Sequence, residues 1–146
     1  ADLAELELAY APPYGSAKDP VNMCGFMIEN IRAGVVKQYH WDEVAALPRD
    51  GSVTILDVRN PGEYERGHID GAINIALDGM RSRLGELDKS KPVYVNCFSG
   101  MRSYIACRIL SGSGFDCYNL SGGWRFYDLT RRGHADNDHY PCGERK

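Results

Sequence analysis

From residue 35 onward, short apolar runs alternate with segments whose apolar residues recur at helical spacing. The run over residues 53–58 is rich in β-branched residues and apolar on both faces, as a buried parallel strand is. Residues 102–110 have helical spacing, and the Ser-Gly-Ser-Gly sequence after them would end a helix. The same reasoning predicts further strands over residues 35–39, 72–75, 92–96 and 115–120, and further helices over residues 41–47, 61–67, 80–87 and 124–130. This alternation predicts an α/β domain over residues 35–132, with a mostly parallel central sheet and helices on both faces.

The segment before this domain follows a different pattern. Residues 6–8 alternate with period two and predict a short strand, whereas helical spacing predicts a helix over residues 21–32, with Gly34 as its C-cap. Residues 11–20 between them are rich in Pro and Gly, which is typical of neither a helix nor a strand. Because residues 1–34 hold too few large apolar side chains for a core of their own, we expect them to need a packing partner.

The composition narrows the class of protein. The chain has 146 residues, which suits one ordinary domain with some additional length. With 43% hydrophobic and 25% charged residues, it has the composition of a folded globular protein, and wholesale disorder is excluded. No apolar run approaches the roughly 18–20 residues that cross a bilayer. A net charge of −3 gives no reason to expect nucleic acid or an anionic membrane as a partner.

The cysteines and the first residues indicate the compartment. Five widely spaced cysteines, without a Cys-x-x-Cys pair, argue against a disulfide scaffold and favour reduced thiols in the cytoplasm. The chain begins with Ala1, and its first residues lack the basic and apolar regions of a secretory signal. We therefore expect a piece of a longer, cytoplasmic protein.

The candidate chemistry lies where the predicted strand 92–96 meets the next helix. Ligands of open α/β sheets bind beyond the carboxyl ends of the strands, and Cys97 stands at this position. The free N–H groups and the dipole of the following helix would favour its thiolate, and Arg102 would add a positive charge. Gly100 would let the loop between them curl without steric cost. We predict that Cys97 is a nucleophile, and the alternative is a small buried apolar side chain.

Four segments resemble, in the correct order, the motifs of the rhodanese (sulfurtransferase) domain. They are residues 56–59, 63–75, 97–103 and 120–124, within a resemblance that runs from about residue 34 to residue 129. Ala76 departs from the family, which usually has Pro there, and this affects a loop conformation rather than the chemistry. The resemblance implies a rhodanese-like fold and a catalytic Cys97 that takes a sulfane sulfur, holds it as a persulfide and passes it to a thiol acceptor. It also implies that the loop and the first helical turn bind the substrate, through Phe98, Ser99, Gly100, Met101, Arg102 and Ser103.

Loop length separates this interpretation from a phosphatase. Related phosphatases of the cell-cycle type have five residues between the nucleophilic cysteine and the arginine, whereas four separate Cys97 from Arg102. A shorter ring of N–H groups should fit a sulfur atom better than a tetrahedral phosphate. The loop therefore favours sulfur transfer.

Other polar and reactive residues are interpreted mostly as structural. We expect Asp57 and Arg59 to pair and support the active loop, with direct substrate contact as the alternative. His68 is expected to be a structural imidazole rather than a base. Cys107, Cys117 and Trp124 are assigned to the core, although the edge of Trp124 could line the site.

Residues 133–146 are polar, and we expect them to form a loose C-terminal tail. His134 lies in this tail with His139 and Cys142, but the three lack a fourth ligand, so no metal site is expected.

A second resemblance concerns residues 10–22, which are similar to the end of the dimerisation domain of flavin-dependent pyridine-nucleotide disulfide reductases. This group contains coenzyme A-disulfide reductases, some of which carry a C-terminal rhodanese domain. The resemblance implies FAD, NADH and coenzyme A for a longer parent protein, whose reductase domain would be a partner, and no cofactor within this chain. We therefore expect a sulfurtransferase domain of a coenzyme A persulfide, polysulfide or disulfide reductase, acting on small sulfur donors and thiol acceptors. The alternative is a rhodanese-like binding or regulatory module without turnover, but the intact loop from Cys97 to Arg102 favours the enzyme.

Overall fold

The computed structural model describes residues 2–8 and 18–135. The chain divides into two compact units, Ala1–Lys37 and Gln38–Lys146.

The first unit contains α1 (Asp2–Glu5) and α2 (Pro20–Arg32). α2 begins with a proline, which suits the first helical turn, and Asp19 before it accepts a hydrogen bond from the N–H of Val21 (2.9 Å). α2 is followed by Gly34, whose φ of +67° is the left-handed conformation that commonly follows a helix. The predicted helix and its glycine stop are confirmed.

Residues 6–8 do not form the predicted strand. The side-chain amide of Asn22 on α2 donates hydrogen bonds to the carbonyls of Leu3 (3.1 Å) and Leu6 (2.9 Å), which ties this segment to α2. An alternating segment becomes a strand only beside a partner strand, and among the described residues no strand pairs with this one. Residues 11–17, part of the predicted breaker-rich segment, lie outside the described residues.

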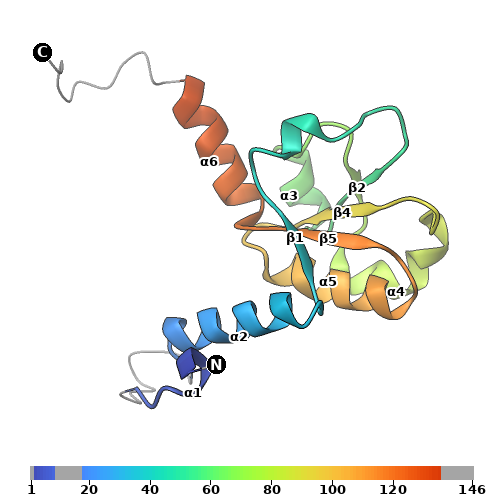
Figure 1. Ribbon diagram of the computed structural model, residues 1–146. Coiled ribbons are helices and arrows are strands. Elements are labelled where there is room, and N and C mark those ends of the chain that lie inside the picture. The colour runs from blue at the N-terminus through green and yellow to red at the C-terminus, as the bar shows by residue number, and fades with distance from the viewer. Residues whose placement is uncertain (1, 9–17, 136–146) are drawn as a thin grey trace, which may run out of the picture. The chain divides into compact units, whose positions relative to one another are not determined.

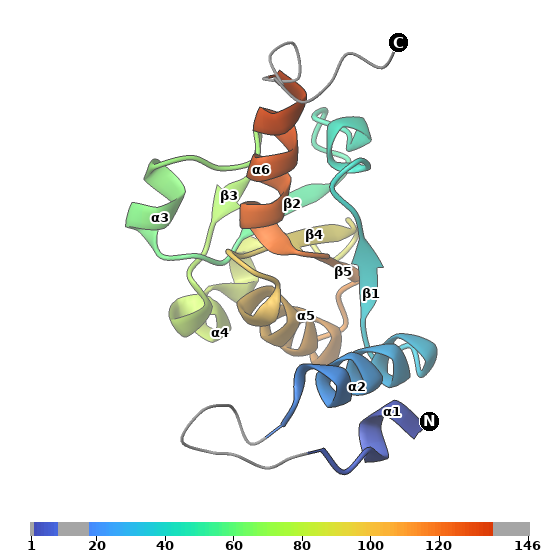
Figure 2. The same ribbon diagram turned by 90° about the vertical axis from the view of Figure 1, so that its left-hand side faces the viewer.

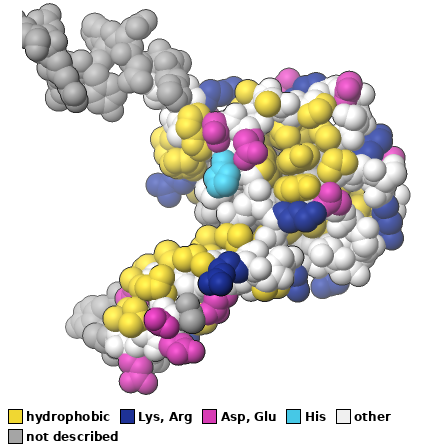
Figure 3. Space-filling view, viewed as in Figure 1, with side chains coloured by type: hydrophobic (Ala, Val, Ile, Leu, Met, Phe, Trp, Pro, Cys, Tyr) yellow, Lys and Arg dark blue, Asp and Glu magenta, His cyan; other side chains and the backbone are white. Residues whose placement is uncertain are grey.

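Many apolar side chains of the first unit are exposed, and Figure 3 shows hydrophobic side chains along this part of the surface. The exposed fractions lie between 39% and 50% for Leu3, Leu6, Leu8, Val21, Met23, Met27, Ile28 and Ile31. These side chains agree with the expectation that the segment needs a packing partner.

The second unit is built around a five-stranded sheet with the order β1-β5-β4-β2-β3. Its strands are β1 (Lys37–Tyr39), β2 (Thr54–Asp57), β3 (Ile73–Asn74), β4 (Val93–Asn96) and β5 (Cys117–Leu120). The pairs β2–β3, β2–β4 and β4–β5 are parallel, so the carboxyl ends of these four strands lie at one edge of the sheet. All the strands predicted after residue 34 are present, and the mostly parallel α/β fold is confirmed.

Helices cover both faces of this sheet, as predicted. They are α3 (Pro61–Glu65), α4 (Met80–Arg83), α5 (Met101–Gly112) and α6 (Gly123–Ala135), with short 3-10 turns at Val44–Ala46, Leu77–Gly79 and Leu84–Glu86. In Figures 1 and 2, α4 and α5 lie below the strands, and α3 and α6 lie above them.

The helix predicted over residues 41–47 is wrong. This segment forms turns and a short 3-10 helix. The N–H of His40 donates to the carboxylate of Glu43 (2.7 Å), which closes a tight turn there. A helix of so few residues has little stability of its own, so such local contacts decide the conformation.

The last helix is longer than predicted. α6 continues to Ala135, past the predicted end at residue 130. Arg132 pairs with Asp128 one turn earlier (2.7 Å), and this contact supports the polar extension of the helix. The rest of the predicted tail, residues 136–146, lies outside the described residues.

The core occupies both faces of the sheet because successive strand residues point to opposite sides. On β4, Val93 and Val95 pack toward α4 and α5, whereas Tyr94 between them packs against the other cluster. The cluster under α4 and α5 includes Leu56, Val58, Met80, Ala106, Cys107, Leu110 and Cys117. The opposite cluster includes Tyr39, Val44, Ile55, Ile69, Leu120 and Trp124. Cys107, Cys117 and Trp124 are thus core residues, as predicted, with exposed fractions of 2%, 7% and 9%.

Candidate active site

Cys97 directly follows β4, at the sheet edge where the sequence placed it. Its side chain is 1% exposed, and its Sγ accepts a hydrogen bond from the backbone N–H of Gly100 (3.1 Å). Gly100 has a φ of +106°, a conformation that L side chains rarely adopt, and it precedes the first residue of α5. The loop therefore turns a backbone donor onto the sulfur immediately before a helix N-terminus.

Ser103 supplies a second polar contact to the sulfur. Its buried hydroxyl lies 3.2 Å from Cys97 Sγ and 3.1 Å from the carbonyl oxygen of Gly100. The hydroxyl has one proton, so it donates either to the sulfur or to the carbonyl. The backbone N–H of Tyr104 (3.0 Å) and the side-chain amide of Asn119 (3.4 Å) also donate to that carbonyl, so it keeps hydrogen bonds when the hydroxyl turns to the sulfur. The Ser103 hydroxyl can therefore donate to a negatively charged sulfur, and it can turn to the carbonyl when the sulfur is protonated.

The first residues of α6 bind the backbone of the Cys97 loop. The N–H of Trp124 donates to the Cys97 carbonyl (2.7 Å), and the N–H of Arg125 donates to the Phe98 carbonyl (3.0 Å). Gly123 has a φ of +63°, and a Cβ there would lie 2.7 Å from both carbonyl oxygens. Sequence reasoning treated this glycine only as part of a turn, although two consecutive glycines before a helix were a signal of close backbone approach.

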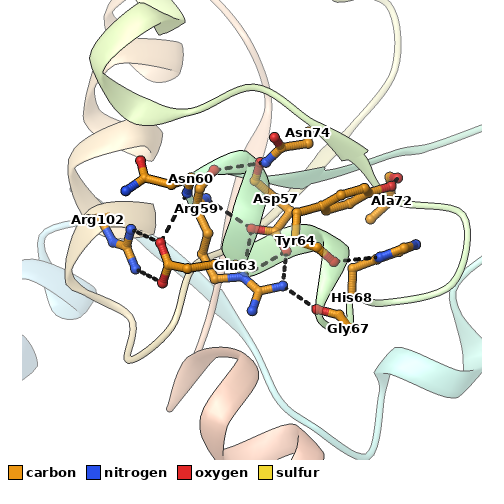
Figure 4. A network of polar contacts seen from close by, with 10 residues as sticks. All are labelled: Asp57, Arg59, Asn60, Glu63, Tyr64, Gly67, His68, Ala72, Asn74 and Arg102. Atoms are coloured by element: carbon orange, nitrogen blue, oxygen red, sulfur yellow. Dashed lines mark hydrogen bonds and ion pairs between the residues drawn. The ribbon is translucent and has the colours of Figure 1, made fainter.

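Arg102 is engaged by a partner that sequence reasoning did not identify. Its two Nη atoms donate to the two carboxylate oxygens of Glu63 on α3, each at 2.7 Å (Figure 4). The backbone N–H of Asn60 donates to the same carboxylate (3.1 Å). The Arg102 hydrogen bonds are the main cause that lowers the pKa of Glu63 to about 2, and the same contact raises the pKa of Arg102. Arg102 therefore lies beside the loop as predicted, but with its charge balanced.

Asp57 and Arg59 form the predicted pair at the end of β2. Their closest contact is 2.6 Å, and both side chains are buried, with at most 3% exposed. Arg59 also donates to the Gly67 carbonyl (2.7 Å), and its guanidinium lies over the ring of Trp124 at 5.0 Å. A buried ion pair is costly to desolvate unless further hydrogen bonds satisfy it, and these contacts do so. The pair thus anchors the loop before α3 against the start of α6.

His68 belongs to the same network, shown in Figure 4, and agrees with the structural interpretation. Its Nδ1 is 2.9 Å from the Tyr64 carbonyl, and its ring stacks on that of Tyr64 at 3.8 Å. The Tyr64 hydroxyl donates to the Ala72 carbonyl (2.5 Å). These contacts hold the α3 region together and involve neither Cys97 nor its loop.

The outer part of the Cys97 loop is apolar. Phe98 and Met101 are 43% and 56% exposed, and Ser99 is also exposed. Of the predicted substrate-binding residues, Gly100 and Ser103 thus contact the sulfur, Arg102 contacts Glu63, and the other three face outward. Their role in binding stays a prediction.

Two further findings concern metals and membranes. In the described ranges, no group of three or more His, Cys, Asp or Glu side chains could hold a metal ion. Two members of the tail trio considered above, His139 and Cys142, lie outside those ranges. None of the helices in the described part of the chain is long and apolar enough to span a bilayer.

Comparison with known proteins identifies the family. The family described as rhodanese-like domain matches residues 40–128. The thiosulfate sulfurtransferase GlpE of Shewanella oneidensis is 38% identical over 84 residues, which cover 57% of this chain and 83% of that protein.

Two solved structures resemble the chain over most of its length. The crystal structure of reduced Bacillus anthracis CoADR-RHD has a TM-score of 0.82 and 43% identity, covering 94% of this chain and 24% of that one. An NAD-dependent persulfide reductase from A. fulgidus has a TM-score of 0.71 and 37% identity, covering 86% of this chain and 22% of that one. This chain spans about a quarter or less of these two proteins. On its motif order, its sheet topology and these matches, the chain belongs to the rhodanese-like domain family.

Proposed function

We propose that this chain is a sulfurtransferase domain that carries a sulfane sulfur as a persulfide on Cys97 and passes it to a thiol acceptor. The observation that carries the proposal is the buried Cys97 sulfur at the carboxyl edge of the sheet, with hydrogen-bond donors at 3.1 and 3.2 Å from Gly100 and Ser103. Membership of the rhodanese-like family and the likeness to a thiosulfate sulfurtransferase support it.

The transfer consists of two displacements at sulfur. In the first, the Cys97 thiolate attacks the sulfane sulfur of a donor R–S–SH. A new S–S bond forms, the donor S–S bond breaks, and R–S⁻ leaves with the electron pair. In the second, an acceptor thiolate attacks the outer sulfur of the Cys97 persulfide, takes that sulfur as its own persulfide and releases the Cys97 thiolate. Neither displacement requires an external oxidant or reductant.

The loop is suited to stabilise negative charge on sulfur, both in the Cys97 thiolate and in the Cys97 persulfide. An N–H or O–H donor that points at an anionic sulfur forms a charge-assisted hydrogen bond, which is stronger than a neutral one. The N–H of Gly100 is fixed by the backbone, and the Ser103 hydroxyl can rotate toward the sulfur (3.2 Å). The start of α5 adds the positive end of its dipole.

Intact-mass spectrometry tests the proposal. The chain is incubated with a persulfide donor, weighed, and digested to locate the added sulfur. We expect one sulfur on Cys97 and on no other cysteine. Cys97→Ser, which is nearly isosteric, should take up no sulfur and transfer none, whereas Cys24→Ser should behave like the unmodified sequence because Cys24 is an exposed thiol of the first unit. A Cys97→Ser variant that still transfers sulfur would refute the proposal. A domain that loads no sulfur at all would support the alternative of a binding module.

We also propose that the native protein is a reductase of coenzyme A persulfides, polysulfides or disulfides, with FAD and NADH bound by residues outside this chain. The two structural relatives support this because their match includes the first unit as well as the sheet domain, over 94% and 86% of the chain. The exposed apolar side chains of the first unit support it too, since such a surface commonly packs against another part of a protein.

The full-length protein tests this second proposal. Cys97→Ser in that protein should impair reduction of coenzyme A persulfide, followed as NADH oxidation, while reduction of coenzyme A disulfide survives. If both activities are unchanged, the Cys97 domain takes no part in the reaction. If the gene encodes no flavoprotein before Ala1, the chain acts as a sulfurtransferase on its own.

A further inference from the structure

The Cys97 loop has a single cationic side chain, and this side chain is paired with a carboxylate. Between Cys97 and Ser103, Arg102 is the one charged residue. Both of its Nη atoms bind the Glu63 carboxylate at 2.7 Å, and this carboxylate also accepts from the Asn60 N–H (3.1 Å). Glu63 is thus held in place by its own helix start and by Arg102 together.

A carboxylate in this position cancels most of the field of the guanidinium at longer range, because opposite charges in contact act as a dipole. The two side chains are 33% and 23% exposed, so the pair is partly buried and is screened less by solvent than a fully exposed pair. The pKa of Glu63 near 2 keeps the carboxylate ionised at any pH at which the protein works. The side chains of the loop therefore present little net positive charge beside the sulfur, in addition to the backbone donors and the dipole of α5.

The exposed side chains of the loop favour a donor that carries an organic group. Phe98 and Met101 are exposed on either side of Ser99 and Gly100, and they offer apolar surface rather than charge. A donor with an organic group can pack against such side chains, whereas a small dianion gains nothing from them. The balanced charge and the apolar surface of the loop thus both favour donors with an organic group over a small dianion.

We propose that Glu63 is a specificity-determining residue, which holds Arg102 and thereby makes the Cys97 site select organic persulfides over thiosulfate. This inference rests on the proposed sulfur transfer. Thiosulfate carries two negative charges, and attack on its sulfane sulfur expels sulfite, also a dianion, beside the loop. At its reacting group, an organic persulfide carries at most one negative charge, and it expels a single thiolate. A site whose cation is balanced disfavours the first reaction more than the second.

The rate of loading of Cys97 by each donor tests the proposal. The full chain is mixed with thiosulfate or with the persulfide of β-mercaptoethanol, an uncharged thiol, then quenched and weighed over time. Glu63→Gln removes the negative charge and keeps the shape of the side chain. We expect it to raise the thiosulfate loading rate about tenfold and to change the persulfide rate by less than about threefold.

Glu86→Gln is the matched control. Glu86 also pairs with an arginine, Arg83, at 2.7 Å, but this pair involves neither α3 nor the Cys97 loop. The control removes the same charge from the molecule and should leave the ratio of the two loading rates unchanged. A Glu63→Gln variant that loads from both donors in the original ratio would overturn the proposal while the proposed sulfur transfer stands.

A second measurement needs no variant. A site with net positive charge attracts a dianion less as salt is added, because salt screens the attraction. We expect the loading rate with thiosulfate in the unmodified chain to fall little between low and physiological salt. A steep fall would overturn the inference. If neither donor loads Cys97 under any condition, the proposed function fails, and this inference fails with it.

Discussion

Gly123 shows how one residue without a side chain can determine the geometry of the Cys97 loop. Its φ is +63°, and a Cβ at this position would lie 2.7 Å from the carbonyl oxygens of Cys97 and Phe98. These carbonyls accept hydrogen bonds from the N–H groups of Trp124 and Arg125 at 2.7 and 3.0 Å. The glycine therefore allows the first turn of α6 to bind the Cys97 loop directly.

Replacing this glycine should damage both stability and transfer. In Gly123→Ala, backbone strain should lower the free energy of unfolding by roughly 1–3 kcal/mol, and the displaced loop should reduce the rate of sulfur transfer. Gly133→Ala in the same helix is the control, because a Cβ there meets no atom within 4 Å. It should gain about 0.5–1 kcal/mol from helix propensity. Urea unfolding and a transfer assay measure both variants, and equal behaviour of the two would contradict the role given to Gly123.

The Ser103 hydroxyl gives a second prediction at this scale. Ser103→Ala removes one donor that lies 3.2 Å from Cys97 Sγ, and the volume changes little. Because a hydrogen bond to a charged group contributes about 1.5–3 kcal/mol, the transfer rate should fall about 10- to 100-fold, with a nearly unchanged melting temperature. Ser82→Ala removes a hydroxyl that donates to the Gly79 carbonyl (2.8 Å) at an exposed position, and this variant should transfer sulfur normally. Full activity of Ser103→Ala would exclude the hydroxyl from the reaction.

Sequence reasoning identified Cys97, Gly100 and Arg102 because a strand end, a loop and a helix start are local features. It did not find the Glu63–Arg102 contact, whose members are 39 positions apart. Such a contact depends on how α3 and α5 approach each other at the sheet edge, and no spacing rule contains that information. Glu63 was within a matched motif, but the motif alone gave it no partner.

At the scale of elements, the contact between Glu63 and Arg102 joins α3 to α5, which cover opposite faces of the sheet (Figures 1 and 2). The Asp57–Arg59 pair adds a connection from the end of β2 to the Gly67 carbonyl. These two ion pairs therefore hold β2, α3 and α5 near the Cys97 loop by charge-assisted hydrogen bonds, in addition to apolar packing.

The pKa of Glu63 makes this connection sensitive to acid. The value is about 2 in the folded protein against an ordinary 4.5, chiefly because Arg102 binds the carboxylate. A carboxyl group with a lowered folded-state pKa contributes stability that is fully present above its unfolded pKa and is lost as the pH falls toward the folded value. The free energy of unfolding should therefore fall more steeply between pH 4.5 and about 2 in the unmodified chain than in Glu63→Gln. Urea unfolding at a series of pH values measures this, and parallel curves would contradict it.

Apolar runs that are buried on both faces predicted strands well, whereas the patterns over residues 6–8 and 41–47 were misleading. Residues 53–58 and 92–96 are buried strands because their side chains must be covered on both faces. Residues 6–8 show alternation but have no strand beside them, and residues 41–47 are too few for a stable helix. The strand order β1-β5-β4-β2-β3 was not predicted, since it depends on where each connection crosses the sheet.

At the scale of the whole molecule, the two units differ in how they satisfy their apolar side chains. The second unit, Gln38–Lys146, holds both core clusters and every contact described around Cys97. The first unit, Ala1–Lys37, exposes eight large apolar side chains among its described residues. A unit that has its own core can fold by itself, whereas exposed apolar surface of this kind calls for a partner.

Removing the first 34 residues tests this division. The chain 35–146 keeps the whole of β1 (Lys37–Tyr39) and therefore all five strands of the sheet. We expect it to unfold cooperatively, with a melting temperature close to that of the main transition of the full chain, and to load sulfur on Cys97 at the same rate. It should also bind less of a dye that fluoresces on apolar surface, because the exposed side chains of α2 are gone. A shortened chain without a cooperative transition would mean that the sheet domain depends on the first unit for its folding. Slower loading by a chain that still folds would mean that the first unit contributes to the chemistry at Cys97.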